Sequence, residues 1–215
     1  VHATLHLIHW HISRGSASIV IVSSTAIRTQ MLRDRESLAP ERVALSSAQV
    51  VERVRNLSVY AASSLVGSYM GTRGEIDPAG LLEGPGPEIA LPVVVKNQPL
   101  QFVVPDGPLA PGPFGIHQPV TGRPVDPSEL GVVLVPLVAV DPSGNRIGYG
   151  AGYYDRTFAF RQASGRPILI GLAHQFQVVD RVEPNSWDIP LDLIVTEIGV
   201  LRSGIAPSTA SMGED

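Results

Sequence analysis

The 215-residue sequence contains no cysteine, which excludes disulfide bonds, zinc–thiolate sites and thiol catalysis. Lysine is nearly absent too: Lys96 is the only one, beside fifteen arginines, so a mechanism that requires lysine has one candidate. Basic residues number 16 against 20 acidic ones, a net charge of −4, which predicts neither a nucleic-acid-binding surface nor attraction to an anionic membrane. The apolar run SIVIV near the N-terminus is too short to span a bilayer. We therefore expect a cytoplasmic protein.

The first 25 residues differ in composition from the rest of the chain. They are apolar and contain four of the six histidines: His2, His6, His9 and His11. That spacing could bind a metal, but no cysteine or carboxylate lies beside it, and a loosely ordered terminus is the simpler interpretation. We expect residues 1–25 to be an atypical extension, residues 26–202 to be one domain, and the small, polar residues 203–215 to be a disordered tail.

The hydrophobic pattern alternates between helical and strand periods, which is typical of an α/β domain. Residues 28–57 predict two helices separated at Ala39-Pro40, where proline suits the first turn of the second helix. Pro136 has no amide donor, so a break is expected in the apolar strand that contains it. One further helix is predicted at residues 153–163. Strands are predicted at residues 65–70, 89–95, 100–104, 131–140, 167–173 and 191–196.

Residues 146–156, RIGYGAGYYDR, place three glycines at alternate positions beside tyrosines, arginines and an aspartate. A strand, a glycine-rich turn and a helix in succession can surround a phosphate with backbone N–H groups. The spacing fits neither the dinucleotide-binding Gly-x-Gly-x-x-Gly nor the Walker motif, which ends in a lysine that is absent here. The loop alone leaves two interpretations open, a phosphate-binding loop and a tight structural turn.

Asp155 follows this loop in the first turn of the expected helix. A carboxylate is favoured there by the helix dipole without any ligand. Beside a phosphate it would also suit Mg²⁺, which prefers carboxylate oxygen together with phosphate oxygens and water. Arg146 and Arg156 flank the loop and could neutralise phosphate charge or lie in solvent.

Several motifs in a fixed order resemble the 5-formyltetrahydrofolate cyclo-ligase family, also called methenyltetrahydrofolate synthetase. They are LRDRESLAPER, RGEID, IALPVVV, PGPFGI, VDPSGNRIGYGAGYYDR and IGLAHQFQVVDRVEPNSWDIPLDLIVTE, and the resemblance covers residues 26–200. It implies a Rossmann-like, three-layer α/β/α domain with a mostly parallel or mixed sheet, and a monomer. It also implies the conversion of 5-formyltetrahydrofolate to 5,10-methenyltetrahydrofolate, dependent on ATP and Mg²⁺, through phosphorylation of the formyl oxygen and with release of ADP and phosphate. The partners would be ATP and a reduced folate, not nucleic acid or a membrane.

The resemblance implies roles for thirteen residues, several of them shared between sets. The catalytic set would be Arg28, Arg146 and Tyr153. ATP would contact Arg28, Arg146, Gly148, Tyr149, Gly150, Ala151, Gly152, Tyr153 and Tyr154. The folate would contact Met70, Glu75, Tyr149, Gly150, Ala151, Gly152 and Tyr153. The metal ligands would be Asp155 and Asp188, although on sequence alone Asp192 is an equal candidate to Asp188.

One departure from the family pattern concerns the first helix. The family has a lysine four residues before the arginine that matches Arg28, and this chain has Ser24 there. Arg14 could replace the missing cation. The departure motivates an alternative, a folate-binding homologue with impaired catalysis. A third hypothesis, a phosphate-binding sugar-isomerase-like protein, rests on analogy between folds alone.

Overall fold

The computed structural model describes residues 23–204. The predicted pair of helices is present as α1 (Ser24–Glu36) and α2 (Pro40–Arg55), with Pro40 in the first turn of α2 as expected. Helix α1 begins four residues before the predicted Arg28, because the Ser23 hydroxyl caps it by accepting a hydrogen bond from the Ala26 N–H at 3.2 Å. The four histidines of residues 1–11 and Arg14 lie outside the described residues, and so does most of the predicted tail.

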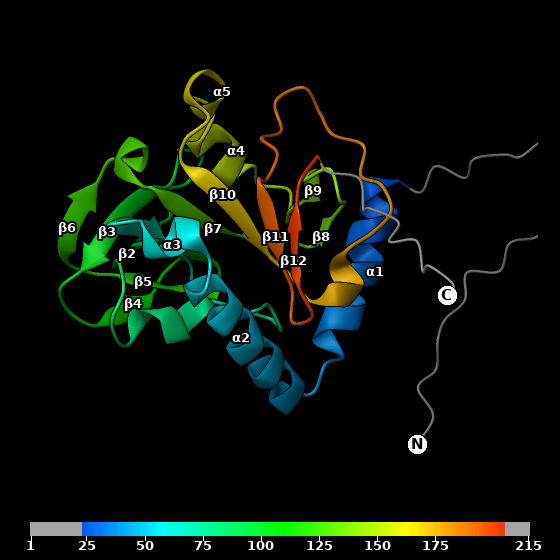
Figure 1. Ribbon diagram of the computed structural model, residues 1–215, viewed down its shortest axis with the longest axis horizontal. Helices are drawn as coiled ribbons and strands as arrows, with labels where there is room; N and C mark the ends of the chain where they lie inside the picture. Colours follow the sequence, from blue (N-terminus) through cyan, green and yellow to red (C-terminus); the bar gives the residue numbers. More distant parts are fainter. Residues whose placement is uncertain (1–22, 205–215) are drawn as a thin grey trace, which may run out of the picture.

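The core is an eight-stranded mixed sheet, as the sequence predicts (Figure 1). Its order is β12-β11-β10-β7-β1-β2-β3-β6, and the five strands from β11 to β2 are parallel. In chain order, the eight strands are β1 Leu65–Gly67, β2 Glu88–Val93, β3 Gln101–Pro105, β6 Gly122–Val125, β7 Val132–Pro136, β10 Ile168–Leu172, β11 Leu193–Val195 and β12 Val200–Arg202. Two small antiparallel pairs lie beside it, β4 (Leu109–Pro111) with β5 (His117–Pro119) and β8 (Ala139–Val140) with β9 (Arg146–Ile147).

Both faces of the sheet are covered, which explains why its central strands are almost wholly apolar. One face packs against α2, the short helix α3 (Ser58–Ala61) and the 3₁₀ turn η1 (Pro78–Leu82). The opposite face packs against the segment around α4 (Tyr153–Thr157), whose neighbour Phe158 is fully buried. The residues of α2 that meet the sheet include Val50, Val51 and Val54, all of which are buried. The remaining 3₁₀ turns are η2 (Pro113–Gly115), η3 (Pro127–Glu129) and η4 (Gln175–Gln177).

Two details differ in form from a simple strand or helix. The apolar run 131–140 breaks at Pro136, as predicted, and continues as β8 in the small sheet. The single helix predicted over 153–163 is two short helices, α4 and α5 (Arg161–Ser164). The chain leaves helical geometry at Phe158 (φ −106°, ψ 18°), whose ring packs near those of Phe102 and Phe160. Burial of this ring on the sheet outweighs helix continuity.

The strand order reverses direction at β1, which gives the sheet a natural binding crevice. The chain passes from β1 to β2 on one side and returns to β7 on the other. In open α/β sheets, ligands bind at such a switch point, outside the carboxyl ends of the strands. Glu75 follows β1 and the glycine loop follows β9, so both segments lie within reach of this crevice. None of the helices within residues 23–204 is long and apolar enough to span a membrane.

Candidate active site

A cavity of about 570 Å³ lies at the switch point. All thirteen residues singled out in the sequence line it: Arg28, Met70, Glu75, Arg146, Gly148, Tyr149, Gly150, Ala151, Gly152, Tyr153, Tyr154, Asp155 and Asp188. A larger hollow of about 1260 Å³ runs between α2 and η1, but none of the thirteen lines it. Convergence of residues from distant parts of the chain identifies the smaller cavity as the candidate site.

The glycine loop lines this cavity, and its backbone donors have no partner among the described residues. No hydrogen bond within residues 23–204 employs the N–H groups of residues 148–152 as donors. A methyl group built on Gly148 or Gly150 would meet no atom within 4 Å, so packing does not explain these glycines. Gly150 has φ +100°, which a residue with a side chain rarely adopts, whereas Ala151 is not among the residues with positive φ. These features fit a loop shaped to receive a ligand better than a tight structural turn.

Helix α1 holds the loop from one side. Arg28 Nε donates to the Gly148 carbonyl at 2.9 Å. Ser24, one turn earlier on the same helix, also lines the cavity. The position at which the resembling family has lysine therefore faces the site, and this chain offers a hydroxyl there.

Asp155 is fixed by two donors rather than by a helix dipole, because α4 has only five residues and a correspondingly small dipole. Its Oδ1 accepts from Arg146 Nη2 at 2.6 Å and from the Ile189 N–H at 3.1 Å. Arg146 also donates to the Ile189 carbonyl. These bonds join the glycine loop to the segment that carries Asp188.

Asp188 lies next to this junction, and its Oδ2 accepts from the Asn185 N–H at 2.8 Å and the Asn185 side chain at 3.1 Å. Within the described part of the chain, hydrogen bonds leave Oδ2 of Asp155 and Oδ1 of Asp188 unused. Two free carboxylate oxygens fit Mg²⁺ when phosphate and water complete its shell. No group of three acidic, histidine or cysteine side chains that could hold a metal occurs among residues 23–204.

Asp192, the other metal candidate in the sequence, is held by tertiary contacts instead. It pairs with Arg161 and accepts from the Leu169 N–H at 2.7 Å. It does not line the cavity. The geometry thus separates two aspartates that the sequence could not.

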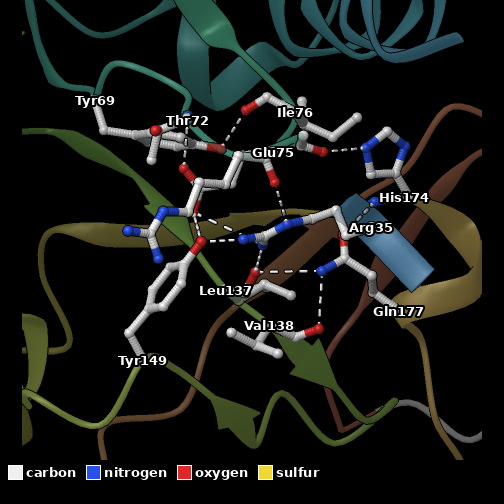
Figure 2. Close-up of polar contacts among 12 residues, drawn as sticks. Arg35, Tyr69, Thr72, Glu75, Ile76, Leu137, Val138, Tyr149, His174 and Gln177 are labelled. Atoms are coloured by element: carbon white, nitrogen blue, oxygen red, sulfur yellow. Dashed lines mark hydrogen bonds and ion pairs between the residues drawn. The ribbon is translucent and has the colours of Figure 1, made fainter. Parts of the chain in front are cut away.

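A second polar cluster of the cavity surrounds Glu75, which is 6% exposed. Figure 2 shows the residues that contact it. Its Oε2 accepts from the Thr72 N–H and its Oε1 from the Tyr149 hydroxyl, both at 3.0 Å. Burial raises the pKa of the Glu75 carboxyl, and the buried cation of Arg35, 3.8 Å away, is the main influence that lowers it. Burial also raises the pKa of Tyr149, to about 12, so its hydroxyl keeps the proton that it donates.

Apolar and aromatic side chains form other parts of the cavity wall. Met70 lies beyond the carboxyl end of β1, and Phe114 and Ile116 of the PGPFGI segment line the cavity. Phe114 and Trp187 are 70% and 66% exposed, so they offer aromatic surface at the cavity to a planar ligand. The Tyr153 ring stacks against the guanidinium of Arg156, which also donates to the Ala151 carbonyl at 2.7 Å.

Sequence reasoning missed three polar residues of this site. Arg35 is buried behind Glu75, Thr72 supplies a backbone donor, and Asn185 holds Asp188. Only Arg35 had a readable signal, because it follows Arg28 by seven residues, two helical turns, and so lies on the same face of α1.

Several known proteins resemble this chain in sequence over most of its length. A sequence model of the 5-formyltetrahydrofolate cyclo-ligase family matches residues 20–197. The 5-formyltetrahydrofolate cyclo-ligase of Haemophilus influenzae is 32% identical over 179 residues, which are 79% of this chain and 95% of the relative. The protein of the same name from Escherichia coli K12 is 32% identical over 177 residues, covering 77% of this chain and 96% of the relative.

The fold has counterparts among solved structures as well. The 5,10-methenyltetrahydrofolate synthetase of Aquifex aeolicus superposes with a TM-score of 0.72 at 32% identity, over 89% of this chain and 99% of the other. The Mycoplasma pneumoniae protein of the same kind gives a TM-score of 0.66 at 22% identity, over 82% of this chain and 99% of the other.

Proposed function

The chain belongs to the 5-formyltetrahydrofolate cyclo-ligase family, and from this premise we propose that it converts 5-formyltetrahydrofolate and ATP to 5,10-methenyltetrahydrofolate, ADP and phosphate. One observation carries the proposal: the family's functional positions, scattered over 160 residues between Arg28 and Asp188, line one cavity at the switch point. A protein that kept only the fold would have no reason to keep these side chains together.

We propose that the glycine loop and α1 bind the triphosphate. The unused N–H groups of residues 148–152 are donors for phosphate oxygens, and the open space at Gly148 and Gly150 admits them to the backbone. Arg28 and Arg146 add positive charge at the two ends of the loop. Backbone donors and arginines held in this way stabilise charge on a transferring phosphoryl group.

Asp155 and Asp188 are the residues that would hold Mg²⁺. Bound Mg²⁺ would neutralise phosphate charge and orient the nucleotide. Arg146 and the Ile189 N–H both bind Oδ1 of Asp155, which leaves its other oxygen for the ion. Asn185 binds Oδ2 of Asp188 and so leaves Oδ1 for the ion.

Glu75 would hold the folate by accepting hydrogen bonds from the N–H edge of the pterin. In this orientation the formyl oxygen attacks the γ-phosphorus, and the bond to the departing ADP breaks. N10 then attacks the activated carbon, and inorganic phosphate leaves. The cavity supplies alignment and shielding from water, neither of which requires a covalent nucleophile, in agreement with a chain that has no cysteine.

The direct test mixes purified protein with 5-formyltetrahydrofolate, ATP and Mg²⁺ and follows the near-ultraviolet absorbance of the methenyl product. We expect absorbance to grow and to stop when a chelator removes Mg²⁺. No growth at high ATP would reject the proposal of full activity.

Ser24 favours a second candidate, a folate-binding homologue with impaired catalysis. It lines the cavity where the family has lysine, and the only lysine of the chain, Lys96, does not line the cavity. Such a protein would bind 5-formyltetrahydrofolate and leave ATP intact, and Ser24→Lys would restore turnover. The isomerase-like hypothesis rested on fold alone, and family membership removes its basis.

A further inference from the structure

Arg35 is the buried cation beside Glu75, in the part of the cavity that we call the folate end. It has no role in the binding of ATP and folate proposed above. It is 1% exposed and is the only buried residue of α1. Its Nε donates to the Arg73 carbonyl at 3.0 Å, and its Nη1 donates to the Leu137 carbonyl at 3.2 Å (Figure 2). Its Nη2 donates to the Tyr149 hydroxyl. These contacts fix the guanidinium on three segments at once.

The contacts among Arg35, Tyr149 and Glu75 impose a direction on the hydrogen bonds. A guanidinium has no acceptor, so the Tyr149 oxygen accepts from Arg35 and its single proton points to Glu75. The second route is direct, since Arg35 Nη1 lies 3.8 Å from Glu75 Oε1. Arg35 therefore acts on the carboxylate both through space and through the tyrosine.

Helix α1 joins this network to the glycine loop. Arg28 and Arg35 are seven residues apart, about two helical turns, and bind consecutive loop residues, Gly148 and Tyr149. On the other side, Gly74 has φ +74°, and a side-chain carbon there would lie 2.7 Å from the Arg35 carbonyl. The loop that carries Glu75 is thus fitted closely against the end of α1.

We propose that Arg35 is a positioning residue, which holds the Glu75 carboxylate in place for the folate, directly and through the Tyr149 hydroxyl. The identity of the ligand rests on the proposed function, whereas the role of Arg35 toward Glu75 does not. Without the guanidinium, only the hydrogen bonds from the Thr72 N–H and the Tyr149 hydroxyl would oppose the effect of burial on the pKa of Glu75, and its carboxyl would become protonated at higher pH. A protonated carboxyl accepts fewer hydrogen bonds, so folate binding would weaken at the acid end of the pH range.

The other ionisable groups around Glu75 do not replace Arg35. The hydroxyls of Tyr69, Tyr149 and Tyr154 keep their protons, because burial raises the pKa of each. The carboxylate of Asp77 raises the pKa of Glu75 further. Burial lowers the pKa of His174 and so favours its neutral form, although the hydrogen bond to the Gly74 carbonyl at 2.9 Å acts in the opposite direction. Within residues 23–204, Arg35 is the cation at ion-pair distance from Glu75.

The test compares Arg35→Gln and Tyr149→Phe with wild type, with Arg33→Gln as the matched control because Arg33 is an exposed arginine on the same helix. Carbon-13 NMR of labelled glutamate follows the titration of the Glu75 carboxyl without any ligand, the signal being assigned with Glu75→Gln. We expect its midpoint to rise in both variants and to stay at the wild-type value in the control. Equal midpoints in wild type and every variant that folds would overturn the proposal.

A second readout is the dissociation constant for 5-formyltetrahydrofolate as a function of pH, beside that for ATP with Mg²⁺. Loss of one hydrogen bond to a charged group predicts roughly tenfold weaker folate binding in Tyr149→Phe, greatest at acid pH. ATP binding is compared in Arg35→Gln, because Tyr149 itself is among the residues expected to contact ATP, and it should change less than folate binding since the Arg28 contact with the glycine loop remains. If Arg35→Gln does not fold, Tyr149→Phe decides, and unchanged folate binding with an unchanged midpoint contradicts the proposal. Wild-type protein that binds no folate would instead reject the proposed function, while the titration still tests Arg35.

Discussion

The two ends of the cavity differ in how far the protein satisfies its own polar groups. At the proposed folate end, around Glu75, both carboxylate oxygens accept hydrogen bonds and a buried arginine lies beside them. The proposed phosphate end consists of the glycine loop, Asp155 and Asp188. There the N–H groups of residues 148–152 donate to no other described residue, and each aspartate keeps an unused oxygen. The first end is organised without a ligand, and we expect the second to be completed by ATP and Mg²⁺.

This difference separates two kinds of contribution to function. A preorganised group loses little free energy of reorganisation when substrate binds, and a substitution there should appear mainly in folate affinity. Groups that await a ligand gain their partners from it, so ATP with Mg²⁺ should stabilise the fold by mass action. The experiments below test whether the two ends are separable in this way.

The largest effect is expected from Asp155→Asn at the phosphate end. It removes the negative charge with which Asp155 is proposed to hold Mg²⁺, and we expect kcat to fall by about 100-fold or more. Folate binding in the absence of ATP should remain at the wild-type level. The control is Asp180→Asn, because Asp180 is exposed and does not line the cavity. Wild-type dependence of turnover on Mg²⁺ in Asp155→Asn would contradict the metal assignment.

Glu75→Gln tests the opposite end. The amide retains the size of the side chain but loses the charge, and roughly 10- to 100-fold weaker binding of 5-formyltetrahydrofolate is expected, because hydrogen bonds to charged groups contribute about 1.5–3 kcal/mol. ATP binding should be unaffected. Glu83→Gln is the matched control, since Glu83 is exposed and outside this cavity. A parallel loss of ATP affinity would show that the two ends are not separable.

How far the sequence predicts this molecule also differs between the ends. The phosphate end is marked by a dense local motif, so the glycine loop and Asp155 could be found from a few consecutive residues. The apolar runs and their periods likewise predict the mixed sheet and even the break at Pro136. A short motif and a hydrophobic period depend on neighbouring residues, so both can be recognised in a single sequence.

The folate end is built by contacts that sequence does not display. Arg35 and Tyr149 lie 40 and 74 residues away from Glu75 in the sequence. The three residues meet only when the sheet forms. A turn acid is usually exposed, and nothing in RGEID indicates that Glu75 is buried against an arginine of α1. Sequence alone left Asp188 and Asp192 equal for the same reason, because the pairing of Asp192 with Arg161 is a tertiary contact.

A gain of function is expected from Ser24→Lys, which returns to α1 the cation of the family pattern. A lysine at this cavity-lining position would place a positive charge near the triphosphate, and we expect the KM for ATP to fall by about five- to tenfold, with the folate KM unchanged. Thr25→Lys is the matched control, because it adds the same charge to the same helix at an exposed position that does not line the cavity. An equal change in both variants would mean that net charge, rather than position, is responsible.

The smallest effect is a pH dependence of stability that reveals what organising the folate end costs. Because burial raises the pKa of Glu75 above its ordinary 4.5, the folded state binds that proton more tightly than the unfolded state. The contribution of Glu75 to stability is therefore full below pH 4.5 and is lost as the pH rises through the raised value. Urea unfolding of wild type and Glu75→Gln between pH 4 and 8 should show wild type losing stability relative to the variant as pH rises, by a small part of a folding free energy of about 5–15 kcal/mol. Exposed Glu83→Gln should not reproduce this trend. A difference between wild type and Glu75→Gln that grows with pH in favour of wild type would mean that Arg35 more than offsets burial, and that the folate end is organised at no electrostatic cost.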